Sequence, residues 1–85
     1  MKLDKVKITV TGAASGIGKA TALKLLESGH DLIVVDLPGS NFDFLPSSNV
    51  QIIYGDVSNQ DDRNAIIAAS KGVDGLVNAA GKIEM

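Results

Sequence analysis

The chain has 85 residues and a net charge of −2, and its isoelectric point is near 5.1. This length allows at most one domain, and a content of 45% hydrophobic and 21% charged residues is typical of a globular chain rather than a disordered one. The scattered lysines and arginines of an acidic chain argue against binding to nucleic acid or to an anionic membrane. The absence of cysteine excludes disulfides and thiolate metal sites.

The sequence shows no membrane-spanning or export segment. Its longest apolar run, residues 65–69, is far too short to cross a membrane, and no hydrophobic signal segment follows residues 1–5. Together with the missing cysteines, this predicts a protein of the reducing cytoplasm.

The first predicted element is a strand at residues 6–11, where apolar and polar side chains alternate. Lys7 and Thr9 are expected to mark a face or an end of this strand that is not fully buried. A glycine-rich stretch then leads into a predicted helix over residues 17–28. Gly29 is placed to end that helix in the left-handed conformation.

The second predicted strand, residues 32–35, is a continuous run of β-branched and aliphatic residues, which is typical of a parallel strand covered on both faces. Residues 37–49 contain two prolines and a glycine, so we expect a loop with one helical turn around residues 41–45. Residues 52–54 are predicted to form the third strand.

The last two predicted elements are a helix over residues 59–70 and a strand over residues 76–78. Ser58 is the expected N-cap of this helix, with Asp61 three residues further on, and Gly72 is expected to terminate it. The order of elements predicts an α/β fold with a parallel sheet in strand order 3-2-1-4 and flanking helices.

The glycine-rich stretch between the first strand and the first helix is a candidate binding site for a phosphate-containing ligand. Unsatisfied N–H groups and the dipole of the helix favour an anion there. The glycines are expected to act at three points: Gly12 in the turn, Gly16 where the backbone approaches the phosphates, and Gly18 where the helix packs on the sheet. This spacing differs from G-x-G-x-x-G, and it differs from a P-loop because Ile17-Gly18 stands where the glycine-lysine pair would be.

Residues 11–18, Thr-Gly-Ala-Ala-Ser-Gly-Ile-Gly, resemble the cofactor loop T-G-x-x-x-G-x-G of the short-chain dehydrogenase/reductase family. Three further elements agree in order and spacing. Asp36 ends the second strand, Asp56-Val57 follows the third, and Asn78-Ala79-Ala80-Gly81 is similar to the family's N-[N/A]-A-G element. The resemblance implies a Rossmann-type, NAD-binding domain over residues 1–85, truncated after the fourth strand.

The resemblance also implies roles for individual residues. The pyrophosphate and the adjoining ribose would be bound by the glycine loop, namely by Gly12, Ser15, Gly16, Ile17 and Gly18. Asp36 would accept hydrogen bonds from the adenosine ribose and repel a 2′-phosphate, which favours NAD over NADP. Ser15 and Leu37 stand where NADP-preferring relatives often carry a basic residue, and this reinforces the preference for NAD.

The remaining implied roles concern the adenine and the end of the fourth strand. Asp56 and Val57 would face the adenine, Asn78 would mainly support the central sheet, and Ala79, Ala80 and Gly81 would allow the cofactor to approach. Three alternatives stay open from the residues alone. Gly12, Gly16 and Gly18 could merely form a tight turn. Asp36 could be an ordinary solvated strand end, and Asp56 could cap the turn before Ser58.

The family transfers hydride between nicotinamide and a secondary alcohol or carbonyl, using a Y-x-x-x-K motif and a serine. Tyr54 is not that tyrosine, because the residue four positions later is Ser58 rather than lysine. The resemblance covers about the first third of a typical member and therefore implies an N-terminal part without the catalytic groups. Residues 70–81 suggest a hydroxysteroid dehydrogenase or carbonyl reductase subgroup.

If the sheet stops at the fourth strand, that strand forms an edge. Its residues Leu76 and Val77 then lie beside unpaired backbone groups, which favours self-association with another chain. The alternative to an oxidoreductase is a non-catalytic nucleotide-binding or interaction module of this length.

Overall fold

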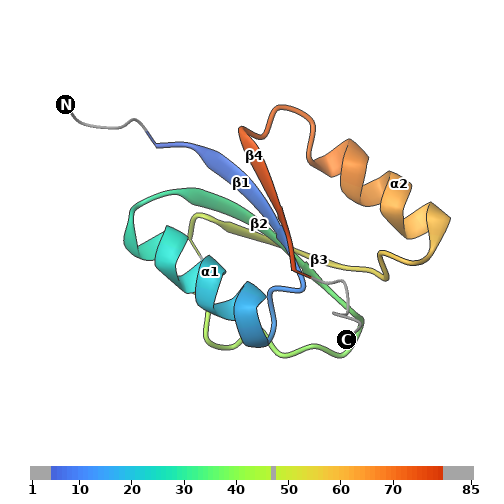
Figure 1. The fold of residues 1–85 in the computed structure, drawn as a ribbon, viewed down its shortest axis with the longest axis horizontal. Helices are drawn as coiled ribbons and strands as arrows, with labels where there is room; N and C mark the ends of the chain where they lie inside the picture. The colour runs from blue at the N-terminus through green and yellow to red at the C-terminus, as the bar shows by residue number, and fades with distance from the viewer. Residues whose placement is uncertain (1–4, 47, 80–85) are drawn as a thin grey trace, which may run out of the picture.

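The computed structural model describes residues 5–46 and 48–79, which form a parallel four-stranded sheet with one helix on each face (Figure 1). In chain order the elements are β1 (Lys7–Thr11), α1 (Gly16–Glu27), β2 (Asp31–Asp36), β3 (Val50–Tyr54), α2 (Gln60–Ala69) and β4 (Gly75–Asn78). The strands lie in the order β3-β2-β1-β4, and every neighbouring pair is parallel. The predicted fold class and strand order are confirmed.

The core lies on both faces of β2. Its four central residues, Leu32 to Val35, are at most 1% exposed, as the unbroken apolar run predicts. Leu32 and Val34 pack on the α1 side of the sheet, whereas Ile33 and Val35 pack with Ile66 of α2 on the other side. Because successive side chains of a strand point to opposite faces, one strand holds both helices in place.

The prediction that Thr9 is incompletely buried was wrong. Lys7 is exposed, but Thr9 has no exposed surface, and its hydroxyl lies 2.8 Å from the hydroxyl of Ser70, just beyond α2. The polar side chain is tolerated in the core because this hydrogen bond satisfies it. The end of α2 is thereby joined to the centre of the sheet.

Helix α1 ends as the sequence predicts. Gly29 has a φ of +89°, and its N–H donates to the carbonyl of Leu26 at 2.9 Å. The N–H of His30 donates to the carbonyl of Leu25 at 3.2 Å. These two bonds make a Schellman motif, which turns the chain directly into β2.

The connection between β2 and β3 contains no helix in its described residues. A single hydrogen-bonded turn joins the N–H of Leu45 to the carbonyl of Phe42 at 3.0 Å, within the predicted turn. Phe42 is buried in the core beneath α1, and its ring centroid lies 6.1 Å from that of Phe44 and 5.8 Å from that of Tyr54. An aromatic cluster therefore anchors this connection in place of a helix.

The N-cap of α2 lies one residue after the predicted position. Asn59, not Ser58, caps the helix, because its Oδ1 accepts a hydrogen bond from the N–H of Asp62 at 3.0 Å. The Ser58 hydroxyl donates instead to Oδ1 of Asp56 at 2.6 Å. Serine and asparagine are both good capping residues, so only the local partners decide between them.

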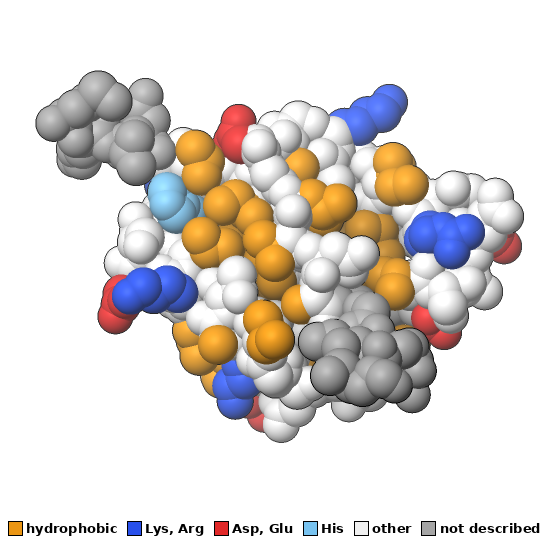
Figure 2. Space-filling view, viewed as in Figure 1, with side chains coloured by type: hydrophobic (Ala, Val, Ile, Leu, Met, Phe, Trp, Pro, Cys, Tyr) orange, Lys and Arg blue, Asp and Glu red, His pale blue; other side chains and the backbone are white. Residues whose placement is uncertain are grey.

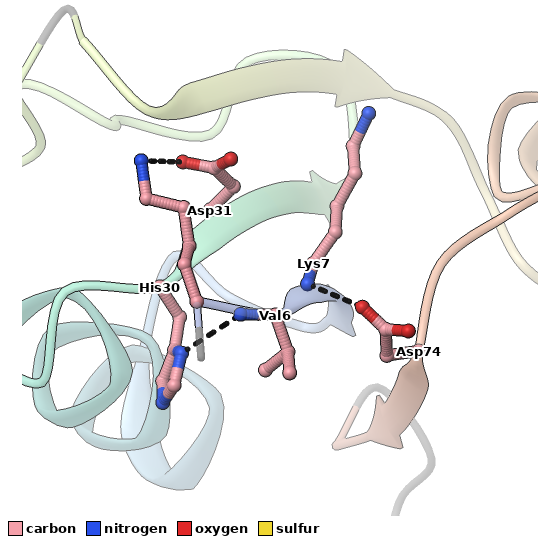
Figure 3. A network of polar contacts seen from close by, with 6 residues as sticks. Val6, Lys7, His30, Asp31 and Asp74 are labelled. Atoms are coloured by element: carbon pink, nitrogen blue, oxygen red, sulfur yellow. Dashed lines mark hydrogen bonds and ion pairs between the residues drawn. The ribbon is translucent and has the colours of Figure 1, made fainter. Parts of the chain in front are cut away.

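Polar contacts close the end of the sheet where the strands begin (Figure 3). The N–H of Val6 donates to Nδ1 of His30 at 3.2 Å, and His30 is half-buried. The N–H of Lys7 donates to Oδ2 of Asp74 at 2.9 Å, just before β4. These contacts fasten the start of β1 to the neighbouring segments on both sides.

Strand β4 forms one edge of the sheet, as expected, and pairs with β1. Leu76 on this strand is 63% exposed. Figure 2 views the molecule from the same side as Figure 1. It shows hydrophobic side chains gathered across the middle of that face, between the positions of the two helices. No helix in the described part of the chain is long and apolar enough to cross a membrane.

Candidate cofactor-binding site

A pocket of about 740 Å³ opens where the parallel strands end. It is built by the last residues of β2 and β4, by the start of α1 and by the loops that follow β1, β2 and β3. Its wall consists of Gly12, Ser15, Gly16, Ile17, Val35, Asp36, Leu37, Gly55, Asp56, Val57, Ser58, Val77, Asn78 and Ala79. Ligands of open α/β sheets bind at this edge, because the loops diverge there.

The pocket brings together most of the residues that the sequence singles out. Gly18 is the exception among the described residues, since it is absent from the wall. Ala80 and Gly81 lie outside the described residues. Sequence reasoning missed the wall residues Val35, Gly55, Ser58 and Val77. Each adjoins a predicted site residue, so the rule that strand ends form the site would have found them.

The glycine loop presents the start of α1 to this pocket. Gly12 and Gly16 have φ values of +68° and +59°, which residues other than glycine rarely adopt. Ser15 is the N-cap, but its side chain makes no capping hydrogen bond, and the first turn contains no acidic residue. The positive end of the helix dipole is therefore left for an anion in the pocket.

Gly18 acts behind the loop rather than in the wall. A Cβ at this position would overlap the carbonyl oxygen of Gly12 and lie 2.6 Å from its carbonyl carbon. The helix backbone thus approaches the loop more closely than any side chain would permit. The nearest atoms belong to Gly12 and Ala13, so the close approach is between α1 and the loop that follows β1.

Asp36 joins the end of β2 to the glycine loop. Its Oδ2 accepts a hydrogen bond from the N–H of Ala14 at 2.9 Å, and its Oδ1 accepts one from the N–H of Leu37 at 2.7 Å. It is therefore more than a solvated strand end. Each carboxylate oxygen has two lone pairs, so Asp36 retains acceptor capacity for ligand hydroxyls in the pocket.

Asp56 caps the turn after β3, which was one of the two alternatives for this residue. Its Oδ1 accepts hydrogen bonds from the N–H of Ser58 at 2.8 Å and from the Ser58 hydroxyl at 2.6 Å. The side-chain and backbone hydrogen bonds from Ser58 lower the pKa of the Asp56 carboxyl. The wall of the pocket therefore carries an ionised carboxylate here at neutral pH.

The end of β4 is held by β1. The hydroxyl of Thr11 donates to Oδ1 of Asn78 at 2.8 Å, and the N–H of Ala79 donates to the carbonyl of Thr11 at 3.2 Å. Asn78 thus connects adjacent strands at the rim of the pocket. Tyr54, by contrast, lies outside the wall and packs against Phe42.

The sequence profile of the short chain dehydrogenase family matches residues 6–85. A short-chain dehydrogenase/reductase of Talaromyces verruculosus is 34% identical over 87 residues, covering 96% of this chain and 34% of the relative. The human 3-hydroxyacyl-CoA dehydrogenase type-2 is 35% identical over 79 residues, covering 85% of this chain and 30% of the relative. The chain therefore spans about a third of the length of the curated relatives that it matches.

Solved structures give the same result. A short-chain dehydrogenase from Streptomyces avermitilis superposes with a TM-score of 0.84 at 28% identity, covering 93% of this chain and 32% of the other. A 4-hydroxyisoleucine dehydrogenase in complex with NADH superposes with a TM-score of 0.78 at 28% identity, covering 95% of this chain and 35% of the other. Sequence profile, relatives and fold agree, and the chain belongs to the short-chain dehydrogenase family.

Proposed function

We propose that the pocket binds NAD and that the chain is the NAD-binding part of an NAD-dependent dehydrogenase or reductase. The observation that carries this proposal is that the uncapped start of α1 and the carboxylate of Asp36 share one pocket. The first suits a pyrophosphate, and the second suits the hydroxyls of a ribose. Gly12, Ser15, Gly16 and Ile17 would surround the pyrophosphate, with Gly18 holding the loop against the helix.

A preference for NAD over NADP follows from the charges of the wall. No lysine or arginine stands among its described residues, whereas Asp36 and Asp56 are acidic. A 2′-phosphate beside Asp36 would meet an uncompensated negative charge. Leu37 follows Asp36 and offers no positive charge to such a phosphate.

The adenine would lie against the loop after β3. Val57 would pack on the ring, and Asp56 would accept a hydrogen bond from the exocyclic amine, while Ser58 occupies Oδ1 of the same carboxylate. Asn78 and Ala79 would line the approach of the other half of the cofactor, together with Ala80 and Gly81.

The proposed reaction is hydride transfer between nicotinamide C4 and a secondary alcohol or carbonyl, with a hydroxysteroid as the candidate substrate class. Bound NAD supplies the hydride acceptor. The Y-x-x-x-K motif of the family does not occur in these 85 residues, so we assign no catalytic residue to this chain. We expect residues 1–85 to bind the cofactor in the cytoplasm without turning it over.

Calorimetry with NAD, NADP and ADP-ribose tests this proposal. NAD and ADP-ribose should bind with similar affinity, because the adenosine diphosphate part makes the proposed contacts, and NADP should bind more weakly. Failure of all three to bind would overturn the proposal and favour the alternative of an interaction module. Hydride transfer catalysed by these residues alone would contradict the absence of catalytic groups.

Self-association through the β4 edge stays a prediction. The exposed Leu76 and the hydrophobic side chains around β4 support it (Figure 2). Analytical ultracentrifugation should show a dimer or larger species that is lost in Leu76→Lys. A monomer at all concentrations would contradict it.

A further inference from the structure

The wall of the pocket at residues 55–59 is held in place by side chains that lie outside the pocket. Oδ2 of Asp62 accepts a hydrogen bond from the backbone N–H of Asp56 at 2.9 Å. Nη1 of Arg63 donates a hydrogen bond to the carbonyl of Val57 at 3.1 Å. Both side chains come from the first turn of α2, and neither residue belongs to the wall. They act on the peptides of the two residues proposed to meet the adenine.

The first of these side chains is itself fixed in position. The N–H of Asp62 donates to Oδ1 of the N-cap Asn59 at 3.0 Å. A Cβ built on Gly55 would lie 3.5 Å from Cβ of Asp62, so the segment passes at van der Waals distance. Asp62 is half-buried, and its backbone is fixed by the hydrogen bond to the N-cap of α2.

The same segment is tied to β2 from the other side. The N–H of Gly55 donates to the carbonyl of Asp36 at 2.9 Å. Consecutive peptides are thus held by a strand at one end and by the Asp62 and Arg63 side chains at the other. Such a backbone has little freedom, so the direction in which the Asp56 and Val57 side chains point is set before a ligand binds.

We propose that Asp62 and Arg63 are positioning residues that determine the specificity of the pocket for adenine. The inference rests on the proposed function, since it concerns the adenine end of the NAD site. The carboxylate of Asp56 can recognise the exocyclic amine only if its peptide is held at the right distance and angle. Without the two contacts from α2, the carboxylate would sample orientations that do not discriminate between bases.

The experiment compares NAD with nicotinamide hypoxanthine dinucleotide, in which an oxygen replaces the exocyclic amine. The carboxylate of Asp56 accepts a hydrogen bond from the amine but is repelled by the oxygen. The ratio of the two dissociation constants therefore measures recognition of the adenine edge, independently of the pyrophosphate and the riboses. We expect the unaltered chain to prefer NAD by about tenfold, the contribution of one hydrogen bond to a charged group.

Asp62→Ala should reduce this preference by about fivefold, because one net hydrogen bond no longer holds the peptide. Asp62→Asn should restore much of it, since the amide oxygen can still accept from the N–H of Asp56. Asp61→Ala is the matched control. It removes the same charge from the same helical turn, but Asp61 is exposed and outside the pocket wall, so the preference should be unchanged.

Arg63→Met tests the second contact with most of the aliphatic stem retained. This variant should also reduce the preference for NAD. As a control, thermal unfolding of each variant should show that the chain is folded under the conditions of the binding measurement. If Asp62→Ala and Arg63→Met keep the preference of the unaltered chain, the inference is wrong and the proposed function stands. If the unaltered chain binds neither dinucleotide, both are wrong.

Discussion

The N–H of Ala14 donates a 2.9 Å hydrogen bond to Oδ2 of Asp36, so the end of β2 holds the glycine loop that follows β1. The neighbouring N–H of Ala13 donates to the carbonyl of Val35 at 3.2 Å and strengthens the same connection. One carboxylate thus serves the shape of the loop and remains available for a ribose. In the proposed complex with NAD, loop geometry and ribose recognition would depend on this single residue.

Asp36→Ala should weaken NAD binding by at least about tenfold in calorimetry, because the ribose loses an acceptor and the loop loses its contact with β2. Asp31→Ala is the control at the opposite end of the same strand. Its exposed ion pair with Lys5, at 3.5 Å, should contribute at most about 1 kcal/mol to stability and nothing to binding. Equal affinities for NAD in the two variants would contradict the proposed role of Asp36.

Gly18→Ala should push α1 away from the loop, because the added methyl group overlaps the carbonyl of Gly12. We expect a loss of about 1–3 kcal/mol in the free energy of unfolding together with a loss of NAD binding. Gly29→Ala, at the other end of α1, meets open space but strains a residue with a φ of +89°. It should cost about 1 kcal/mol and leave binding intact. Denaturant unfolding and calorimetry on both variants separate the two effects.

Thr9→Val should destabilise the chain by about 1 kcal/mol without changing its affinity for NAD, because it removes the hydrogen bond to Ser70 and neither residue lines the pocket. Ser70→Ala should have a similar effect. The double variant should lose little more than either single one, since both remove the same bond. Strictly additive losses in urea unfolding would show that the two hydroxyls contribute independently.

The Asp56 carboxyl should titrate below its ordinary value of 3.8 in the folded chain, because Ser58 donates two hydrogen bonds to the ionised form. Since the folded pKa is the lower one, the stabilisation is present above the ordinary value and is lost as the pH falls through the folded pKa. Ser58→Ala removes the larger contribution, so the pKa should rise. Carboxyl NMR titration measures it in both forms, and Ser70→Ala should leave it unshifted.

Much of the fold and of the candidate site could be predicted because local patterns report burial directly. An unbroken apolar strand such as residues 32–35 must be covered on both faces, and the spacing of the glycines and of Asp36 identifies the edge where a ligand would bind. Strand order followed from the handedness of parallel connections rather than from any side chain.

The contacts between side chains could not be predicted in this way. Thr9 is polar yet fully buried because Ser70, far away in sequence, meets its hydroxyl. Asn59 caps α2 because Asp56 already engages Ser58. In each case a hydrogen-bond partner that the local pattern does not reveal decided the outcome.

The amino-acid sequence alone was enough to predict the sheet, the family resemblance and most of the residues that surround the pocket. Periodicity and short motifs encode these properties in neighbouring positions. The hydrogen bonds by which Asp36 holds the glycine loop, and by which Asp62 and Arg63 hold the loop after β3, became visible in the folded chain alone. These hydrogen bonds require donor and acceptor atoms from separate segments to lie 2.9–3.1 Å apart, and such distances are reached only once the strands and helices have packed.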